Sequence, residues 1–191
     1  MLLLSFESCV NDKDKWTANV PERAMNDHTD RFLAIYLNDH LAALVAAREL
    51  ARRTSSRASG EETRALAGEL VAHFADGEVE VERLLGAIGA RRSRVKRALA
   101  SVAEKGGRVK PNGQLKSRSP LSDLVELEGL TLLLEYEAGL WRSLESAKDG
   151  LAGEDRDFAA RERRASEWQT RLAAHGGEVA RRSLADRPTG E

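Results

Sequence analysis

Apolar residues recur every three to four positions along most of the chain, which is the spacing of amphipathic α-helices. The pattern predicts four long helices, over about 30–53, 60–89, 119–148 and 154–175. Strand-forming residues are sparse, and aromatic residues make up only 5% of the chain. The sequence therefore predicts an all-α protein.

Residues near the ends of these segments are typical of helix caps. Ser59 and Glu62 have the spacing of a capping box, and Gly89 stands where a helix C-terminus favours glycine. Ser119–Pro120 supplies an N-cap followed by proline at the first helical position. Gly176–Gly177 is expected to end the fourth helix.

The lengths of the connections predict how the helices are arranged. About five residues join the first helix to the second and the third to the fourth, so each pair is expected to be antiparallel. Residues 90–119 join the second helix to the third, and a helix of about 25 residues is only about 37 Å long. This segment can therefore cross the whole bundle. The sequence predicts a ferritin-like antiparallel four-helix bundle with one long crossover between helices 2 and 3.

One domain with a tail at each end is expected from the length and the composition. Residues 1–28 are predicted to be a mobile N-terminal tail, residues 29–177 the bundle and residues 178–191 a C-terminal tail. From Met25 onward the chain becomes rich in Ala, Arg, Leu and Glu, so Met25 is an alternative start of the protein.

Several short strings within residues 30–174 carry a resemblance to known proteins. They are Tyr36–Ala42 (YLNDHLA), Glu49–Arg52 (ELAR), Glu104–Lys110 (EKGGRVK), Leu127–Leu130 (LEGL) and Leu140–Trp141. Together they resemble a bacterial ferritin-like family met mainly in high-GC actinobacteria. The resemblance implies a four-helix ferritin-like bundle, and it implies no known activity.

Charge and cysteine content limit the classes of function. The 30 Lys+Arg and 31 Asp+Glu residues give a formal net charge of −1, so the whole molecule has no bias toward nucleic acid. The single cysteine, Cys9, cannot form an internal disulfide, and no secretory signal or transmembrane segment is evident. A cytoplasmic protein is therefore expected.

Carboxylates on three of the predicted helices are candidate metal ligands. Glu128 and Glu135 lie seven residues apart on one face of the third helix. His73 and Asp76 have metal-compatible spacing on the second helix, and Glu49 lies on the first. Iron or manganese is the metal such ligands would bind. The candidate site is thus Glu49, His73, Asp76, Glu128 and Glu135.

The di-iron pattern is incomplete, because the fourth helix has no Glu-x-x-His pair. Ordinary solvated helix faces are the alternative for His73, Asp76, Glu128 and Glu135. Glu126 and Glu137 are expected to be solvated as well. No nucleophile constellation or phosphate loop is evident, so an enzyme is less expected than a non-catalytic protein. We expect a structural or interaction protein or a degenerate metal site, with an iron or manganese oxidase or storage protein as the alternative.

The crossover suggests a third function, because residues 91–118 contain ten Lys or Arg and one acidic residue, Glu104. Such a stretch could bind an anionic surface or nucleic acid, although nucleic acid is not expected without interleaved aromatic residues. The alternative is that this stretch lies against acidic faces of its own bundle.

The predicted first helix has two apolar faces, and the sequence does not say which one is core. One face carries Leu33, Leu37, Leu41 and Leu44, and the other carries Phe32, Tyr36, Ala43, Ala46 and Leu50. We expect a homodimer in which the leucine face meets its own copy, because four exposed leucines would be unfavourable. The alternative is that the crossover, through Val95, Leu99 and Val102, covers this face within one chain.

Overall fold

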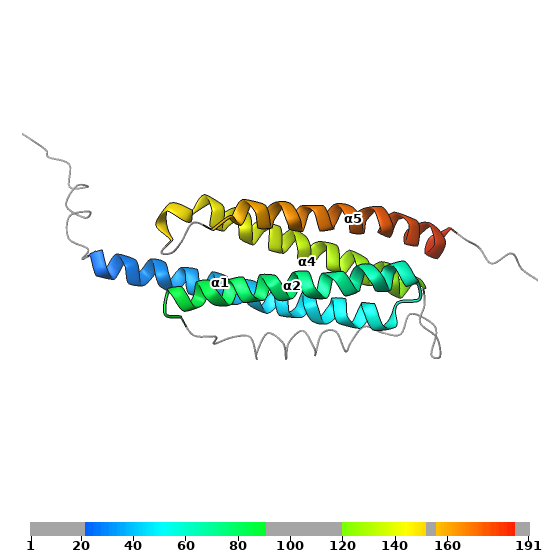
Figure 1. The fold of residues 1–191 in the computed structure, drawn as a ribbon, viewed down its shortest axis with the longest axis horizontal. Helices are drawn as coiled ribbons and strands as arrows, with labels where there is room; N and C mark the ends of the chain where they lie inside the picture. Colours follow the sequence, from blue (N-terminus) through cyan, green and yellow to red (C-terminus); the bar gives the residue numbers. More distant parts are fainter. Residues whose placement is uncertain (1–21, 91–119, 152–155, 186–191) are drawn as a thin grey trace, which may run out of the picture. The chain divides into compact units, whose positions relative to one another are not determined.

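The computed structural model describes residues 22–90, 120–151 and 156–185, with side chains from His28 onward. Within these ranges every element is helical, which confirms the all-α prediction, and no strand occurs among them. The elements, labelled as in Figure 1, are α1 (Glu22–Arg57), α2 (Glu61–Ala87), α4 (Pro120–Ser146), the short 3-10 helix η1 (Lys148–Gly150) and α5 (Phe158–Leu184).

The chain divides into two compact units, residues 1–33 and residues 34–191. The described part of the first unit is the start of α1, where the rings of His28 and Phe32 lie 6.3 Å apart and Phe32 is exposed. Helix α1 starts at Glu22, so the predicted start near residue 30 is too late. The periodic apolar pattern marks where a helix packs, and polar turns can precede that part.

The leucine face of α1 belongs to the core of the second unit. Leu37 and Leu41 are completely buried and Leu44 is 2% exposed, whereas Asp39 on the other face is exposed. The predicted dimer interface through Leu33, Leu37, Leu41 and Leu44 is therefore wrong, because three of its four leucines are already packed within one chain. Each such burial contributes about 1.5–3 kcal/mol to folding.

Helix α4 also has two apolar faces, and they have different environments. Leu127, Leu130, Leu134 and Trp141 are buried in the core. On the other side Val125 is 47%, Leu132 72% and Tyr136 46% exposed. Helix α4 therefore leaves apolar surface exposed at Val125, Leu132 and Tyr136.

The ends of α2 follow local backbone chemistry. Gly89 has a φ of 65°, and the Ala90 and Gly89 amides donate to the carbonyls of Leu85 and Gly86. This is a Schellman ending, which favours glycine at the residue with positive φ, and it confirms the predicted role of Gly89. At the other end the N-cap is Gly60 without a side-chain cap, so the predicted capping box from Ser59 to Glu62 does not form.

Helix α5 is longer than its glycines suggest. Phe158, Ala165, Trp168 and Leu172 form the predicted buried stripe. The helix then continues through Gly176–Gly177 to Leu184 and does not end at His175 as expected. Val179 beyond the glycines is buried. Its packing offsets the cost of about 1 kcal/mol that a glycine brings to a helix interior.

Side-chain contacts show which helices are neighbours in the second unit. Between α2 and α5, Asp76 contacts Arg161 and Glu69 contacts Arg171, so residue numbers rise in one helix as they fall in the other. The numbers also run in opposite directions between α1 and α4, where Thr54 contacts Glu126 and His40 contacts Tyr136.

Helices α4 and α5 show the same opposite order, because Arg142 contacts Glu162 and Glu135 contacts Gln169.

The predicted crossover, with Val95, Leu99 and Val102 and the basic stretch 91–118, lies outside the described residues. So does most of the predicted N-terminal tail. None of the described helices combines the length and the hydrophobicity that a lipid bilayer requires of a spanning helix.

Candidate functional site

A cavity of about 370 Å³ lies between α2, α4 and the start of α5. Its volume falls within the range of small-molecule sites. Its walls carry charged side chains, which are rarely buried unless they are paired. Beside His73, they are Asp76 and Glu80 from α2, Glu137 from α4, Arg156 and Asp157 just before α5, and Arg161 and Arg164 from the first turns of α5.

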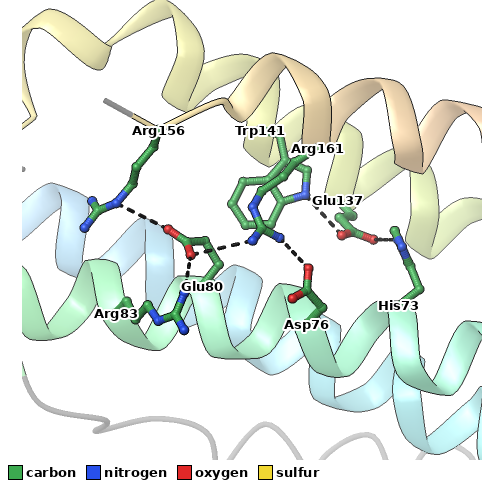
Figure 2. Close-up of polar contacts among 8 residues, drawn as sticks. All are labelled: His73, Asp76, Glu80, Arg83, Glu137, Trp141, Arg156 and Arg161. Carbon is green, nitrogen blue, oxygen red and sulfur yellow. Dashed lines mark hydrogen bonds and ion pairs between the residues drawn. The ribbon is translucent and has the colours of Figure 1, made fainter. Parts of the chain in front are cut away.

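The carboxylate of Glu137 is buried at one side of this cavity, with 2% of its side chain exposed. Its Oε2 lies 2.8 Å from Nε2 of His73, and its Oε1 accepts a hydrogen bond of 3.1 Å from Nε1 of Trp141. Because an ionised carboxylate can only accept, His73 donates through Nε2. Figure 2 shows both contacts. Both carboxylate oxygens are therefore bonded, as a buried charge requires.

Gly77 explains how Glu137 can approach α2 so closely. A Cβ atom at Gly77 would lie 3.2 Å from Oε1 of Glu137 and 3.3 Å from Cδ2 of Leu44. Gly77 follows His73 by four residues, so the two lie on the same face of α2. The missing side chain makes room for the carboxylate beside its imidazole partner.

The carboxylate of Glu80 is surrounded by arginines. Arg83, Arg156 and Arg161 approach its oxygens at 3.3, 3.4 and 3.6 Å, and 8% of the Glu80 side chain is exposed. Figure 2 shows the three guanidinium groups around this one carboxylate. Three guanidinium groups are therefore ion-pair partners of one nearly buried carboxylate.

Arg161 links α5 to both neighbouring helices. Its Nη1 lies 2.8 Å from Oδ2 of Asp76, and its guanidinium lies 5.2 Å from the centre of the Trp141 ring. Trp141 in turn stacks on Phe158, with the ring centres 6.2 Å apart. The guanidinium therefore lies between two carboxylates of α2 and the indole of α4 (Figure 2), where it makes both ion pairs and a cation–π contact.

Local sequence spacing brings these groups together. His73, Asp76 and Glu80 are three and then four residues apart, so they share one face of α2. At the start of α5, Asp157 is the N-cap and accepts a hydrogen bond of 2.7 Å from the Ala160 amide. This cap fixes the first turn of α5. Arg161 lies four residues after the cap, and its side chain reaches Asp76 of α2.

Only two of the five predicted metal ligands lie at this cavity, His73 and Asp76. Glu49 is exposed on α1 and pairs with Arg52, whose hydrogen bond is the main cause that lowers the pKa of Glu49. Glu128 is exposed. Glu135 is exposed and accepts a hydrogen bond from Gln169. The structure therefore brings together two of the five predicted ligands and leaves Glu49, Glu128 and Glu135 on exposed faces of α1 and α4.

Among the residues that the structure describes, no group of three or more His, Cys, Asp or Glu is placed to hold a metal ion. Sequence reasoning also expected Glu137 to be solvated, and it is instead the most deeply buried carboxylate of the cavity. One signal of its position is Trp141 four residues later, which places an N–H donor on the same face of α4. Its other partner, His73, comes from α2 and could not be found by spacing.

What the cavity can do chemically follows from these contacts. Its carboxylates already have positively charged or N–H partners, so it can hold charge without a bound ion. Comparisons of the chain with family models, curated proteins and solved structures gave no match.

Proposed function

We propose that this protein is a ferritin-like antiparallel bundle with a structural or interaction role, in which arginines have replaced the cations of a degenerate metal site. The observation that carries the proposal is the position of Arg161, whose guanidinium faces Asp76 and Glu80 together. In carboxylate-bridged bundles a metal ion supplies the positive charge at such a place.

The order of contacts supports the antiparallel arrangement. Contacting residues rise in α2 as they fall in α5, and the same inverse order joins α1 to α4 and α4 to α5. The connection from Arg57 to Glu61 is short, which favours antiparallel neighbours for α1 and α2. A long connection between Ala87 and Pro120 completes the ferritin-like pattern.

The charges around Glu80 support a degenerate site. A metal ion that binds Asp76 and Glu80 must displace Arg161 from both, and it must also overcome repulsion from Arg156 and Arg83. Helix α5 supplies arginine where a di-iron bundle needs a glutamate with a histidine. A cytoplasmic location, proposed from the single Cys9, agrees with such a role.

The alternative is an iron or manganese oxidase or storage protein that uses Glu49, His73, Asp76, Glu128 and Glu135. It requires those side chains to converge, whereas Glu49, Glu128 and Glu135 lie apart from His73 and Asp76. It also requires that Glu128→Ala and Glu135→Ala each lower the amount of bound metal.

The test is the metal content of the wild-type protein after growth with added iron and manganese, together with its thermal unfolding with and without each metal. We expect far less than one equivalent of metal and an unchanged melting temperature. A stoichiometric metal that raises the melting temperature, and that is lost in Glu128→Ala, would support the alternative and reject the proposal.

A further inference from the structure

We propose that the cavity between α2, α4 and α5 binds a small oxyanion, a carboxylate or phosphate group, through Arg156, Arg161 and Arg164. This goes beyond the structural role, because a stable bundle does not require a ligand. The inference rests on the hydrogen-bonding groups that the contacts within the cavity leave available.

Each carboxylate of the cavity already has at least one donor or basic partner. Asp76 accepts from Arg161, and Glu137 accepts from His73 and Trp141. Glu80 has three guanidinium partners, and Asp157 accepts from the amide of Ala160. No carboxylate that lines the cavity lacks a donor, so a cationic ligand would have to displace an existing partner.

The donors, in contrast, are in excess. A guanidinium carries five N–H groups. Arg156 contacts Glu80 through Nε and forms no ion pair with a second described residue. Arg164 lines the cavity and forms no ion pair with any described residue. An oxyanion has several acceptor lone pairs and would satisfy these groups in pairs.

Each carboxylate at the cavity also has a basic partner. Asp157 pairs with Arg163, and Glu80 pairs with Arg83, Arg156 and Arg161, whereas Arg164 pairs with no described residue. Arg164 is therefore the cation that an anionic ligand can neutralise.

The distribution of exposure gives the anion a path. Arg164 and Asp157 are exposed, whereas Arg156 and Arg161 have about a quarter of their side chains exposed, at 26% and 27%. Glu137 and His73 are more deeply buried. A small anion can therefore meet Arg164 first and then Arg156 and Arg161. Nδ1 of His73 makes no hydrogen bond with the described residues and is left for a polar group on the ligand.

Titration calorimetry with inorganic phosphate and, separately, with succinate tests the proposal at constant ionic strength. The informative variant is Arg164→Gln, because Arg164 is exposed and its loss breaks no ion pair among the described residues. The matched control is Arg171→Gln. Arg171 is also an arginine of α5, pairs with Glu69 at 3.0 Å, covers the ring of Trp168 and lies outside the cavity.

We expect saturable binding of at least one probe to the wild type, about tenfold weaker binding to Arg164→Gln, and unchanged binding to Arg171→Gln. The probe that binds more tightly identifies the group as phosphate or carboxylate. Absence of saturable binding of both probes to the folded wild type would overturn the proposal. An equal loss in both variants would also overturn it, because it would show a general effect of charge. Both results are independent of the metal content of the protein.

Discussion

His73 of α2 and Glu137 of α4 form a hydrogen bond of 2.8 Å between Nε2 and Oε2 inside the bundle. The pair is enclosed on one side by Trp141, which donates to the other carboxylate oxygen, and on another by Trp168, whose ring centre lies 6.0 Å from that of His73. Two helices that are far apart in the sequence are thus joined by buried polar groups. Such a pair is strongly destabilising when one partner is removed, since the other remains buried and unpaired.

Replacement of Glu137 is therefore expected to destabilise the protein. Glu137→Ala should lower the free energy of unfolding by about 3–5 kcal/mol, because His73 and Trp141 lose their acceptor. Guanidinium-induced unfolding followed by circular dichroism measures the change. Glu135→Ala, on the exposed face of the same helix, is the control and should change stability by no more than about 0.5 kcal/mol. Equal effects of the two variants would show that Glu137 has no special role.

Substitution of Gly77 tests the close approach of Glu137 to α2. In Gly77→Ala the new methyl group would meet Glu137 and Leu44 at 3.2–3.3 Å, so we expect a loss of about 1–3 kcal/mol. In the control, Gly68→Ala, nothing lies within 4 Å of the added carbon. That variant should gain up to about 1 kcal/mol from helix propensity. Thermal unfolding of both variants measures the two changes in stability. A stabilised Gly77→Ala would contradict the close packing of Gly77 against Glu137 and Leu44.

His40 should make the stability depend on pH. Burial lowers the pKa of His40 from 6.5 to about 4 and outweighs the opposite effect of Asp39. Its ring stacks on Tyr136 and meets the edge of Tyr36, at 4.0 and 4.5 Å between ring centres. Between pH 6.5 and 4 the unfolded chain takes up a proton at this residue and the folded chain does not. Stability is therefore lost as the pH falls through this window, and no more is lost below it.

The expected loss from His40 is on the order of 2 kcal/mol, after allowance for water that reaches the ring beside the half-exposed Tyr136. The variant His40→Phe keeps the ring stack and cannot take up the proton. Unfolding free energies at several pH values should therefore fall less steeply for His40→Phe than for the wild type. Parallel curves would show that another group causes the acid sensitivity.

The two apolar faces discussed for α1 and α4 differ in their energetic roles. Leu41→Ala should lower stability by about 2–5 kcal/mol, because Leu41 is completely buried. Leu132→Ala removes the same atoms from a side chain that is 72% exposed, and the change should stay within about 0.5 kcal/mol. Chemical unfolding of Leu41→Ala and Leu132→Ala measures this difference. A large loss of stability in Leu132→Ala would mean that a partner surface covers the Leu132 side chain.

The helices could be predicted from the sequence because each has a periodic apolar stripe, as in Phe158, Ala165, Trp168 and Leu172 of α5. The role of Gly89 at the end of α2 was also predictable, since a glycine after the last apolar turn of a helix is a local signal of its C-terminus. The core face of α1 could not be predicted, because Leu37 and Tyr36 mark two apolar faces of this helix. Only the neighbouring helices decide which face is buried.

Most residues of the candidate site could not be predicted from the sequence. His73 and Asp76 were identified because their spacing on one helix is visible. Glu137 and Arg161 were missed, because each acquires its role from a partner on another helix, His73 for the first and Asp76 for the second. Spacing along one helix shows which side chains share a face, and it does not show what the opposite helix contributes.

Manganese titration of Arg161→Ala most directly tests the proposal that arginine occupies a cation position beside Asp76 and Glu80. The control is Arg171→Ala, which removes the other α5 arginine that pairs with α2 and covers a tryptophan. With folding of each variant checked by circular dichroism, we predict at least about tenfold tighter manganese binding to Arg161→Ala than to the wild type or to Arg171→Ala. Binding to Arg161→Ala no tighter than to the folded control would contradict the account.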